Sequence, residues 1–321
     1  MITVLAGGIG AAKFLEGLVA VKLPEEITVI ANTGDDAQFH GLHVSPDMDT
    51  VLYTLAGVVN RETGWGIADD TFHALQALER LGEETWFRLG DQDIATHLFR
   101  TKRLREGATL SAVSGELCQR FGVGCRILPM SDAPAPTRLR TSAGWLSFQE
   151  YFVKLRQQPD VLEVDLSAAA RCQPAPGVIE TITKSSGIIL APSNPIISIG
   201  PILAVPGVCD ALRNTPAPAV AISPIVGGKA LKGPADRMMQ SLGFGSSAAA
   251  VAELYRDFVD VFVIDEQDAV LEAEVRSKGM KAIVTQTIMG SAEAKQNLAR
   301  TVVKSLEDRH YSGGGGAGRA R

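Results

Sequence analysis

Four carboxylates lie within one short polar stretch of the chain. The segment Asn32-Thr33-Gly34-Asp35-Asp36 is followed by Ser45-Pro46-Asp47-Met48-Asp49-Thr50. Like charges at this density repel one another unless a cation offsets them, and Mg²⁺ is commonly held by one or two carboxylates together with substrate phosphates. Aspartate is also favoured in turns and at helix N-caps. The residue types therefore predict either a magnesium site or a solvated turn with helix caps.

A glycine-rich turn lies at the start of the chain. The run Ile2–Ala6 predicts a strand, Gly7-Gly8-Ile9-Gly10 a tight turn, and residues 11–21 a helix. Backbone N–H groups and the positive end of a helix bind phosphate at such a turn, and Lys13 adds a cation. The chain lacks the Walker pattern GxxxxGK[ST], and alanines break the dinucleotide pattern GxGxxG. Gly7, Gly8 and Gly10 thus predict either a phosphate loop or a turn that allows close helix packing.

The glycine turn and the acidic segment are expected to share one ligand. The run Ile27–Ala31 predicts a second strand before the acidic segment, and a right-handed crossover would make the two strands parallel. Both loops then leave the same edge of the sheet, where α/β folds bind ligands. Phosphate in the glycine loop and Mg²⁺ on Asp35 and Asp49 would form a phosphoryl-transfer site. Asp35 and Asp49 are therefore the candidate catalytic and metal-binding residues, while Asp36 and Asp47 stay open between ligation and helix capping.

The rest of the chain alternates between apolar runs and helical stretches. Strands are predicted at 188–190, 219–222, 261–264 and 282–284, and helices at 234–242, 246–257 and 291–306. This order predicts an α/β fold, a Rossmann-like parallel sheet flanked by helices. Amphipathic stretches replace strands between 61 and 177, which predicts an inserted, mainly helical subdomain. The nucleotide- and metal-binding core is then expected at 1–60 and 178–308, and a flexible glycine-rich tail at 309–321.

Two more loops after predicted strands carry polar residues. Ser193 and Asn194 offer a hydroxyl and an amide to a nucleotide or phosphate, with a proline-stiffened turn and helix cap as the alternative. Lys229 and Lys232 are candidate phosphate partners, with a surface role as the competing interpretation.

Composition and charge limit the classes of protein to which this chain can belong. A chain of 321 residues, 45% hydrophobic and 21% charged, can bury a substantial core. Its net charge of -5 argues against broad attraction to nucleic acids or membranes. The four cysteines form no CxxC pair and match no zinc pattern, which indicates a reducing compartment. With no basic leader before the first strand, a cytoplasmic location is expected.

Together the motifs resemble the 2-phospho-L-lactate transferases of coenzyme F420 biosynthesis, the CofD or FbiA type. The resemblance covers nearly the whole chain, to residue 308, and rests on the order of these segments: Gly7–Gly10, Asn32–Asp36, Ser45–Thr50, Leu89–Asp93, Ala191–Pro195, Ser198–Pro201 and Ser223–Ile225. Alanines at 11 and 12 replace a more Gly- or Pro-containing loop, and Lys13 stands where some members have Arg.

The resemblance implies a reaction and a set of binding residues. The terminal ribityl hydroxyl of the deazaflavin Fo would attack the β-phosphorus of a guanosine diphosphate-linked three-carbon acid and release GMP, with Mg²⁺ as the metal. The implicated residues are Asp35 and Asp49 as metal carboxylates, Gly7 to Gly10 with Ser193 and Asn194 along the nucleotide and acceptor cleft, and Asp91 and Asp93 facing Fo. The family also implies a homodimer. The acid stays open between phospholactate, phosphoenolpyruvate and 3-phosphoglycerate, and the general base is unassigned.

Other functions compete with this interpretation. One is a related nucleotidyl or phosphoryl transferase that acts on another alcohol. Another is a non-catalytic nucleotide-sugar-binding regulator, because related bacterial morphogenesis proteins share the glycine loop and the Rossmann-like core. Asp49 and the segment Ser45–Thr50 favour the enzyme, and the broken GxGxxG pattern argues against an NAD-dependent dehydrogenase.

Overall fold

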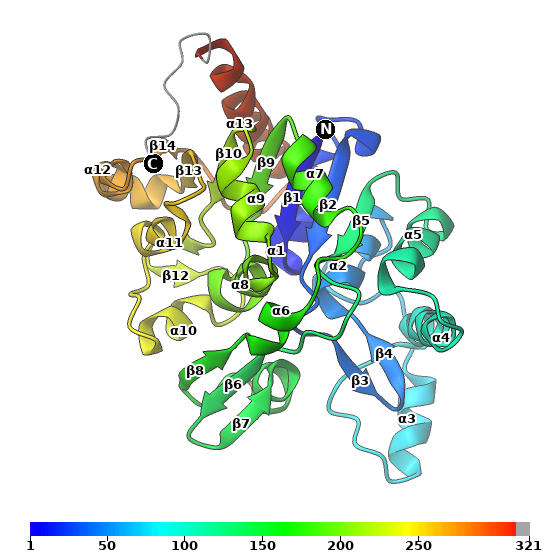
Figure 1. Ribbon diagram of the computed structural model, residues 1–321. Helices are drawn as coiled ribbons and strands as arrows, with labels where there is room; N and C mark the ends of the chain where they lie inside the picture. The colour runs from blue at the N-terminus through cyan, green and yellow to red at the C-terminus, as the bar shows by residue number, and fades with distance from the viewer. Residues whose placement is uncertain (313–321) are drawn as a thin grey trace.

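A seven-stranded parallel sheet forms the centre of the protein. The computed structural model describes residues 1–312, with side chains to residue 308. The strand order is β14-β13-β10-β9-β1-β2-β5, and every neighbouring pair is parallel (Figure 1). The strands are β1 (Ile2–Ala6), β2 (Ile27–Ala31), β5 (Arg126–Pro129), β9 (Gly187–Leu190), β10 (Ala219–Ile222), β13 (Val261–Ile264) and β14 (Lys281–Val284). Most of their residues are buried, as expected for a parallel sheet covered on both faces.

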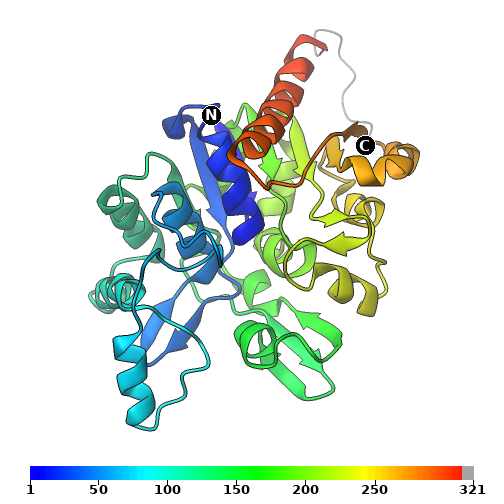
Figure 2. The ribbon, with the colours of Figure 1, turned by 180° about the vertical axis from the view of Figure 1, so that it is seen from behind.

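Four helices cover one face of the sheet. They are α1 (Ile9–Leu18), α2 (Pro46–Leu55), α5 (Leu110–Arg120) and α13 (Ala292–Ser312). Helices α1 and α13 lie side by side in Figure 2. They approach closely because Gly17 has no side chain: a Cβ there would run into the backbone carbonyl of Lys295.

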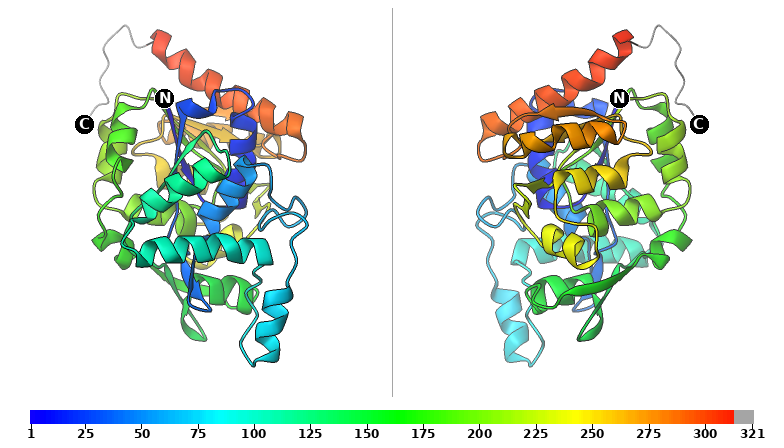
Figure 3. Two further views of the ribbon diagram at one scale, coloured as in Figure 1. Left: turned by 90° about the vertical axis from the view of Figure 1, so that its right-hand side faces the viewer. Right: turned by 90° about the vertical axis from the view of Figure 1, so that its left-hand side faces the viewer.

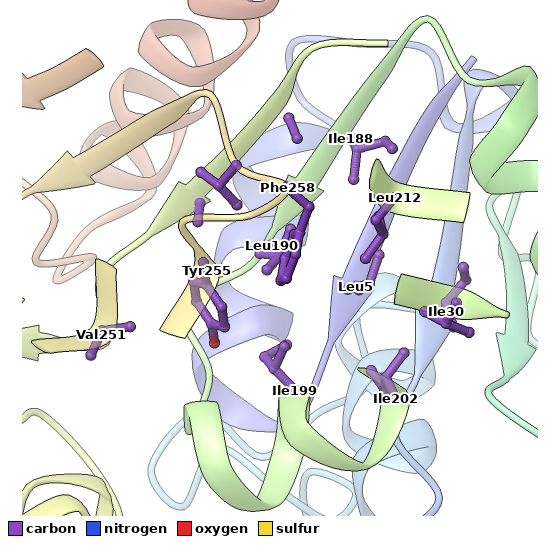
Figure 4. Packing of buried hydrophobic residues seen from close by; sticks show 14 of the residues in the cluster. Leu5, Ile30, Ile188, Leu190, Ile199, Ile202, Leu212, Val251, Tyr255 and Phe258 are labelled. Carbon is purple, nitrogen blue, oxygen red and sulfur yellow. The ribbon is translucent and has the colours of Figure 1, made fainter. Parts of the chain in front are cut away.

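The opposite face is covered by α7 (Val178–Lys184), α8 (Gly200–Ala204), α9 (Val208–Asn214) and α11 (Ala248–Tyr255). Figure 4 shows Leu5, Ile30 and Leu190 from the strands facing Ile199 and Ile202 from the covering segments. The two side views in Figure 3 show helices on both sides of the sheet. Burial of these apolar side chains is the main term that holds the layers together.

Smaller elements surround the carboxyl ends of the strands (Figure 1). On one side lie the hairpin β3 (Ala37–Phe39) and β4 (Leu42–Val44) with α3 (His73–Arg80) and α4 (Asp91–Arg105). On the other lie the antiparallel sheet of β6 (Arg138–Thr141), β7 (Gly144–Ser147) and β8 (Val161–Asp165), the hairpin β11 (Ile225–Val226) and β12 (Lys229–Ala230), and α10 (Ala235–Ser241). The remaining elements are the α-helices α6 (Ser167–Arg171) and α12 (Glu272–Ser277), the 3₁₀-helices η1 (Pro24–Glu26) and η4 (Glu266–Leu271), and the short π-helices η2 (Glu150–Lys154) and η3 (Pro195–Ile199).

The α/β class, the parallel sheet and the six predicted strands are confirmed. One boundary needs correction: β5 lies inside the predicted insertion 61–177 but pairs with β2 in the central sheet, so that range is not wholly separate from the core. The division into domains otherwise stays a prediction. Of the predicted tail 309–321, residues 309–312 form the end of α13, and 313–321 lie outside the described residues.

Within residues 1–312, no single helix is long and apolar enough to span a membrane. One pair of helical segments in this range, Pro195–Ala204 with Val208–Asn214, has a sufficient length and composition together, but it is bent by 87°.

Candidate active site

A cavity of about 1030 Å³ lies at the carboxyl edge of the sheet. Its walls come from the loops after β1, β2, β9, β10 and β14 and from segments around Trp65, Trp86 and Phe148. The chain runs from β1 to β2 on one side and later returns to β9 on the other side of β1. Such a reversal of strand order is the switch point at which open α/β sheets bind ligands.

The glycine loop after β1 is packed tightly against Asp47 and against the loop after β9. The N–H of Gly7 donates to the hydroxyl of Ser193, 3.1 Å away. A Cβ on Gly8 would clash with the carboxylate of Asp47, and one on Gly10 with the carbonyl of Pro192. Close packing, one of the two predicted reasons for glycine, is thus confirmed. It also brings Asp47 against the loop that would hold phosphate.

We expect Gly10→Ala to destabilise the protein by about 1–3 kcal/mol, because its methyl group must displace the backbone at Pro192. The free energy of unfolding in urea measures the effect. Gly115→Ala in α5 is the matched control: a Cβ there meets nothing within 4 Å, so stability should stay equal or rise. Equal stability of the two variants would contradict the packing argument.

Among the residues that the structure describes, two of the four clustered carboxylates, Asp35 and Asp47, form no ion pair. Asp36 accepts from His43 Nε2 at 3.0 Å and from Ser45 Oγ at 2.8 Å. Asp35 and Asp47 instead share the amide of Asn32, whose Nδ2 lies 3.3 Å from Asp35 Oδ1 and 2.9 Å from Asp47 Oδ2. Burial raises the pKa of Asp35, and the charges of Asp47 and Asp36 raise it further. Burial, with the charge of Asp36, raises the pKa of Asp47 to about 7. A cation between Asp35 and Asp47 would relieve this repulsion.

Asp49, predicted as a metal ligand, pairs with a guanidinium in the structure. Both of its oxygens accept from Arg100, which is 1% exposed, and the Nη1 contact measures 3.0 Å. Arg100 Nη1 also lies 3.2 Å from His97 Nδ1. Since Arg100 can only donate, this contact assigns Nδ1 as the acceptor and Nε2 as the protonated nitrogen of His97. The positive charge that neutralises Asp49 therefore comes from the protein itself.

The same network reaches Asp93. His97 Nε2 lies 3.1 Å from Asp93 Oδ1, and the hydroxyl of Tyr53 donates to that oxygen at 2.7 Å. Burial raises the pKa of Asp93, but the neighbouring His97, the hydrogen bond from Tyr53 and the charge of Arg100 outweigh it, so that the pKa falls below its ordinary value. Asp93, His97 and Tyr53 line the cavity. Sequence reasoning missed Arg100 and Tyr53, although Asp93, His97 and Arg100 are spaced for one helix face.

Ser193 and Asn194, predicted as binding residues, line the cavity. The side-chain oxygen of Asn194 accepts from the N–H groups of Ile196 and Ile197, at 2.9 and 3.3 Å, so the predicted helix cap is present. Its Nδ2 is buried and has no partner among the described residues. The cap and a ligand-binding role are therefore compatible, because the amide donor is still available.

The other predicted binding residues separate into two groups. Lys13 and Asp93 line the cavity, whereas Asp91 and Lys229 do not. The carboxylate of Asp91 accepts from the N–H groups of His73 and Ala74, at 3.0 and 2.9 Å, and so caps the start of α3. Lys229 is exposed on β12.

Aromatic side chains form one wall of the cavity. Trp86, Phe87, Phe148 and Phe152 line it, and Trp65 lies at 41% exposure. The rings of Phe148 and Phe152 stack with centroids 5.2 Å apart, and Trp86 meets Phe87 edge to face at 6.1 Å. The phenylalanines were missed because no spacing pattern separates a wall from a core.

A family profile described as "2-phospho-L-lactate transferase CofD" matches residues 2–306. The chain belongs to the CofD family. It is 43% identical over 319 residues to a phosphoenolpyruvate transferase of Kitasatospora aureofaciens, covering 97% of this chain and 99% of that one. A 2-phospho-L-lactate transferase of Methanosarcina mazei is 40% identical over 303 residues, covering 94% and 99%, respectively.

The CofD fold has a more distant structural neighbour. A member of the UPF0052 family from Bacillus halodurans is 16% identical, with a TM-score of 0.65 over 94% of this chain and 98% of that one. This likeness concerns the fold alone. The predicted family is confirmed by sequence, and the protein is a CofD-family phosphotransferase of coenzyme F420 biosynthesis.

Proposed function

We propose that this CofD-family enzyme transfers the β-phosphoryl group of a guanosine diphosphate-linked three-carbon acid, together with that acid, to the terminal hydroxyl of the deazaflavin Fo and releases GMP. The observation that carries the proposal is the pair Asp35 and Asp47, which forms no ion pair with any described residue and of which Asp47 lies against the glycine loop at Gly8. A diphosphate bound there through Mg²⁺ would have its reacting phosphorus within the large cavity.

Mg²⁺ fits this pair by its chemistry. Carboxylate oxygens are its preferred protein ligands, and it usually keeps only one or two of them together with phosphate oxygens and water. Consistent with that number, the side chains described include no group of three His, Cys, Asp or Glu placed to hold a metal. Mg²⁺ would neutralise the diphosphate. Asn32 would fix both carboxylates, and Asp49 would stay with Arg100.

The aromatic wall is the proposed binding surface for the ring system of the acceptor. A deazaflavin is a flat, largely apolar system, and offset or edge-on contacts with Trp86, Phe148 and Phe152 suit such a ring. Asp93, which accepts a hydrogen bond from Tyr53 and lies beside His97, is the candidate to accept a hydrogen bond from a hydroxyl of the acceptor. We assign no acceptor contact to Asp91, whose carboxylate caps α3.

Product masses test the whole proposal. Fo is incubated with Mg²⁺ and guanosine diphosphate-linked phospholactate, phosphoenolpyruvate or 3-phosphoglycerate in separate reactions. We expect one donor to give an Fo phosphodiester and an equal amount of GMP. Relatives named for the first two acids are similarly close to this chain, so the mass identifies the acid. Binding of nucleotide without turnover on any donor would favour a non-catalytic nucleotide-binding regulator.

Magnesium binding gives a test that does not depend on turnover. We expect Mg²⁺ to raise the melting temperature of the wild-type protein, because it binds the folded carboxylate pair. In Asp47→Asn the increase should be largely lost, since one ligand and half of the negative charge are gone. Asp69→Asn, at an exposed position, serves as control and should respond like the wild type. Equal responses in all three proteins would exclude Asp47 as a ligand.

A homodimer and a cytoplasmic location stay predictions. Light scattering coupled to size-exclusion chromatography measures the assembly, and a dimer mass is expected.

A further inference from the structure

Four cations and a single carboxylate lie on or beside α1. Glu16 accepts from Lys295 Nζ at 2.6 Å and from Arg61 Nη1 at 3.0 Å. Lys13 and Lys232 take part in no ion pair within the described part of the chain. Four cations and one carboxylate leave an excess of three positive charges, on a chain whose net charge is -5. Such an excess favours binding of an anion.

Lys232 connects two segments above the glycine loop. Its Nζ donates to the carbonyl of Thr63 at 3.0 Å, which leaves two N–H donors for a ligand. A Cβ added at Gly64 would lie 3.5 Å from Lys232 Nζ and 3.0 Å from Ile9 Cγ2, so the ammonium lies near the first residue of α1. The positive end of that helix adds to the attraction for an anion.

Lys13 lies one turn further along α1 and lines the same cavity as Lys232. Burial lowers the pKa of Lys13, and the charges of Lys232 and Lys295 lower it further. Glu16, the carboxylate on the same helix, is engaged by Arg61 and Lys295. An anion that enters the cavity here would thus meet two lysines without carboxylate partners.

We propose that Lys13 and Lys232 bind the β-phosphoryl group of the donor and so distinguish the diphosphate donor from the monophosphate product. The inference rests on the proposed function, which supplies the diphosphate. In the reaction the acceptor oxygen bonds to the β-phosphorus, and the bond from that phosphorus to the bridging oxygen breaks. GMP keeps the electron pair of that bond, and the hydroxyl proton is released to solvent water. GMP then has no group for these lysines, which favours its release.

Calorimetric titration with GDP and with GMP, each with Mg²⁺, tests the assignment. Lys232→Met should weaken GDP binding by about 10- to 100-fold, the range of a charge-assisted hydrogen bond, and GMP binding by less than about 2-fold. Lys229→Met is the matched control: it removes a lysine from the same region but outside the cavity, and should bind both nucleotides like the wild type. Lys232→Arg should keep the preference for GDP.

The possible results separate this inference from the proposed function. Wild-type binding of neither nucleotide would overturn the proposed function itself. Wild-type binding of GDP with an unchanged affinity in Lys232→Met would overturn only the role of Lys232. Equal weakening of GDP and GMP would also overturn it, because Lys232 would then act through its contact with Thr63 on the site as a whole. Melting temperatures of the variants check that each is folded.

Discussion

Asp35→Asn is expected to lower the rate of phosphoryl transfer by roughly 10³-fold while leaving the protein as stable as the wild type, or more stable. Asp35 is 5% exposed, and burial together with Asp47 and Asp36 raises its pKa. A neutral amide of the same shape removes that repulsion but also removes a proposed ligand of Mg²⁺. Steady-state kinetics at saturating donor and thermal unfolding, both at pH 8, measure the two effects.

The combination of the two results matters more than either alone. If the carboxylate of Asp35 had only a structural role, its replacement would lower the stability of the protein. If it binds a cation, its replacement should lower the activity and leave the fold intact. Asp69→Asn, at the exposed position, should change neither quantity. Turnover at the wild-type rate in Asp35→Asn would remove this residue from the proposed metal site.

Asp49→Ala should cost about 3–5 kcal/mol of unfolding free energy, because it leaves the guanidinium of Arg100 buried without its partner. Denaturation with urea measures the loss. The double variant Asp49→Leu/Arg100→Met removes both charges and should recover part of the stability, since apolar groups of similar volume replace a buried ion pair at little net cost.

This prediction separates two roles for Asp49. If it holds the fold through Arg100, its loss should leave the effect of Mg²⁺ on the melting temperature in place in whatever protein remains folded. If Asp49→Ala instead kept full stability and lost the response to Mg²⁺, Asp49 would be the metal ligand that the sequence predicted, and Asp47 would not.

Local sequence alone determined much of the architecture. The run Ile27–Ala31, and the strand, glycine turn and helix before it, are continuous in sequence and follow from local periodicity, so their type and parallel pairing were predicted. β5 was assigned to the insertion, because four residues carry too little periodicity to show which sheet they join. β5 pairs with β2, which precedes it by about a hundred residues, and α5, just before β5 in the chain, packs against β5. Local sequence patterns do not encode such distant contacts.

The candidate site divides in the same way. The sequence alone predicted the family, the two loops that meet at the carboxyl edge of the sheet, and the residues on those loops. Each of these depends only on the order of residues along the chain. Only the tertiary structure decided which carboxylate has which partner. Arg100 reaches Asp49 from 51 positions along the chain, and Lys232 reaches Thr63 from 169. A charge is neutralised by whatever lies nearby in space, and that neighbour is set by how the helices and loops pack.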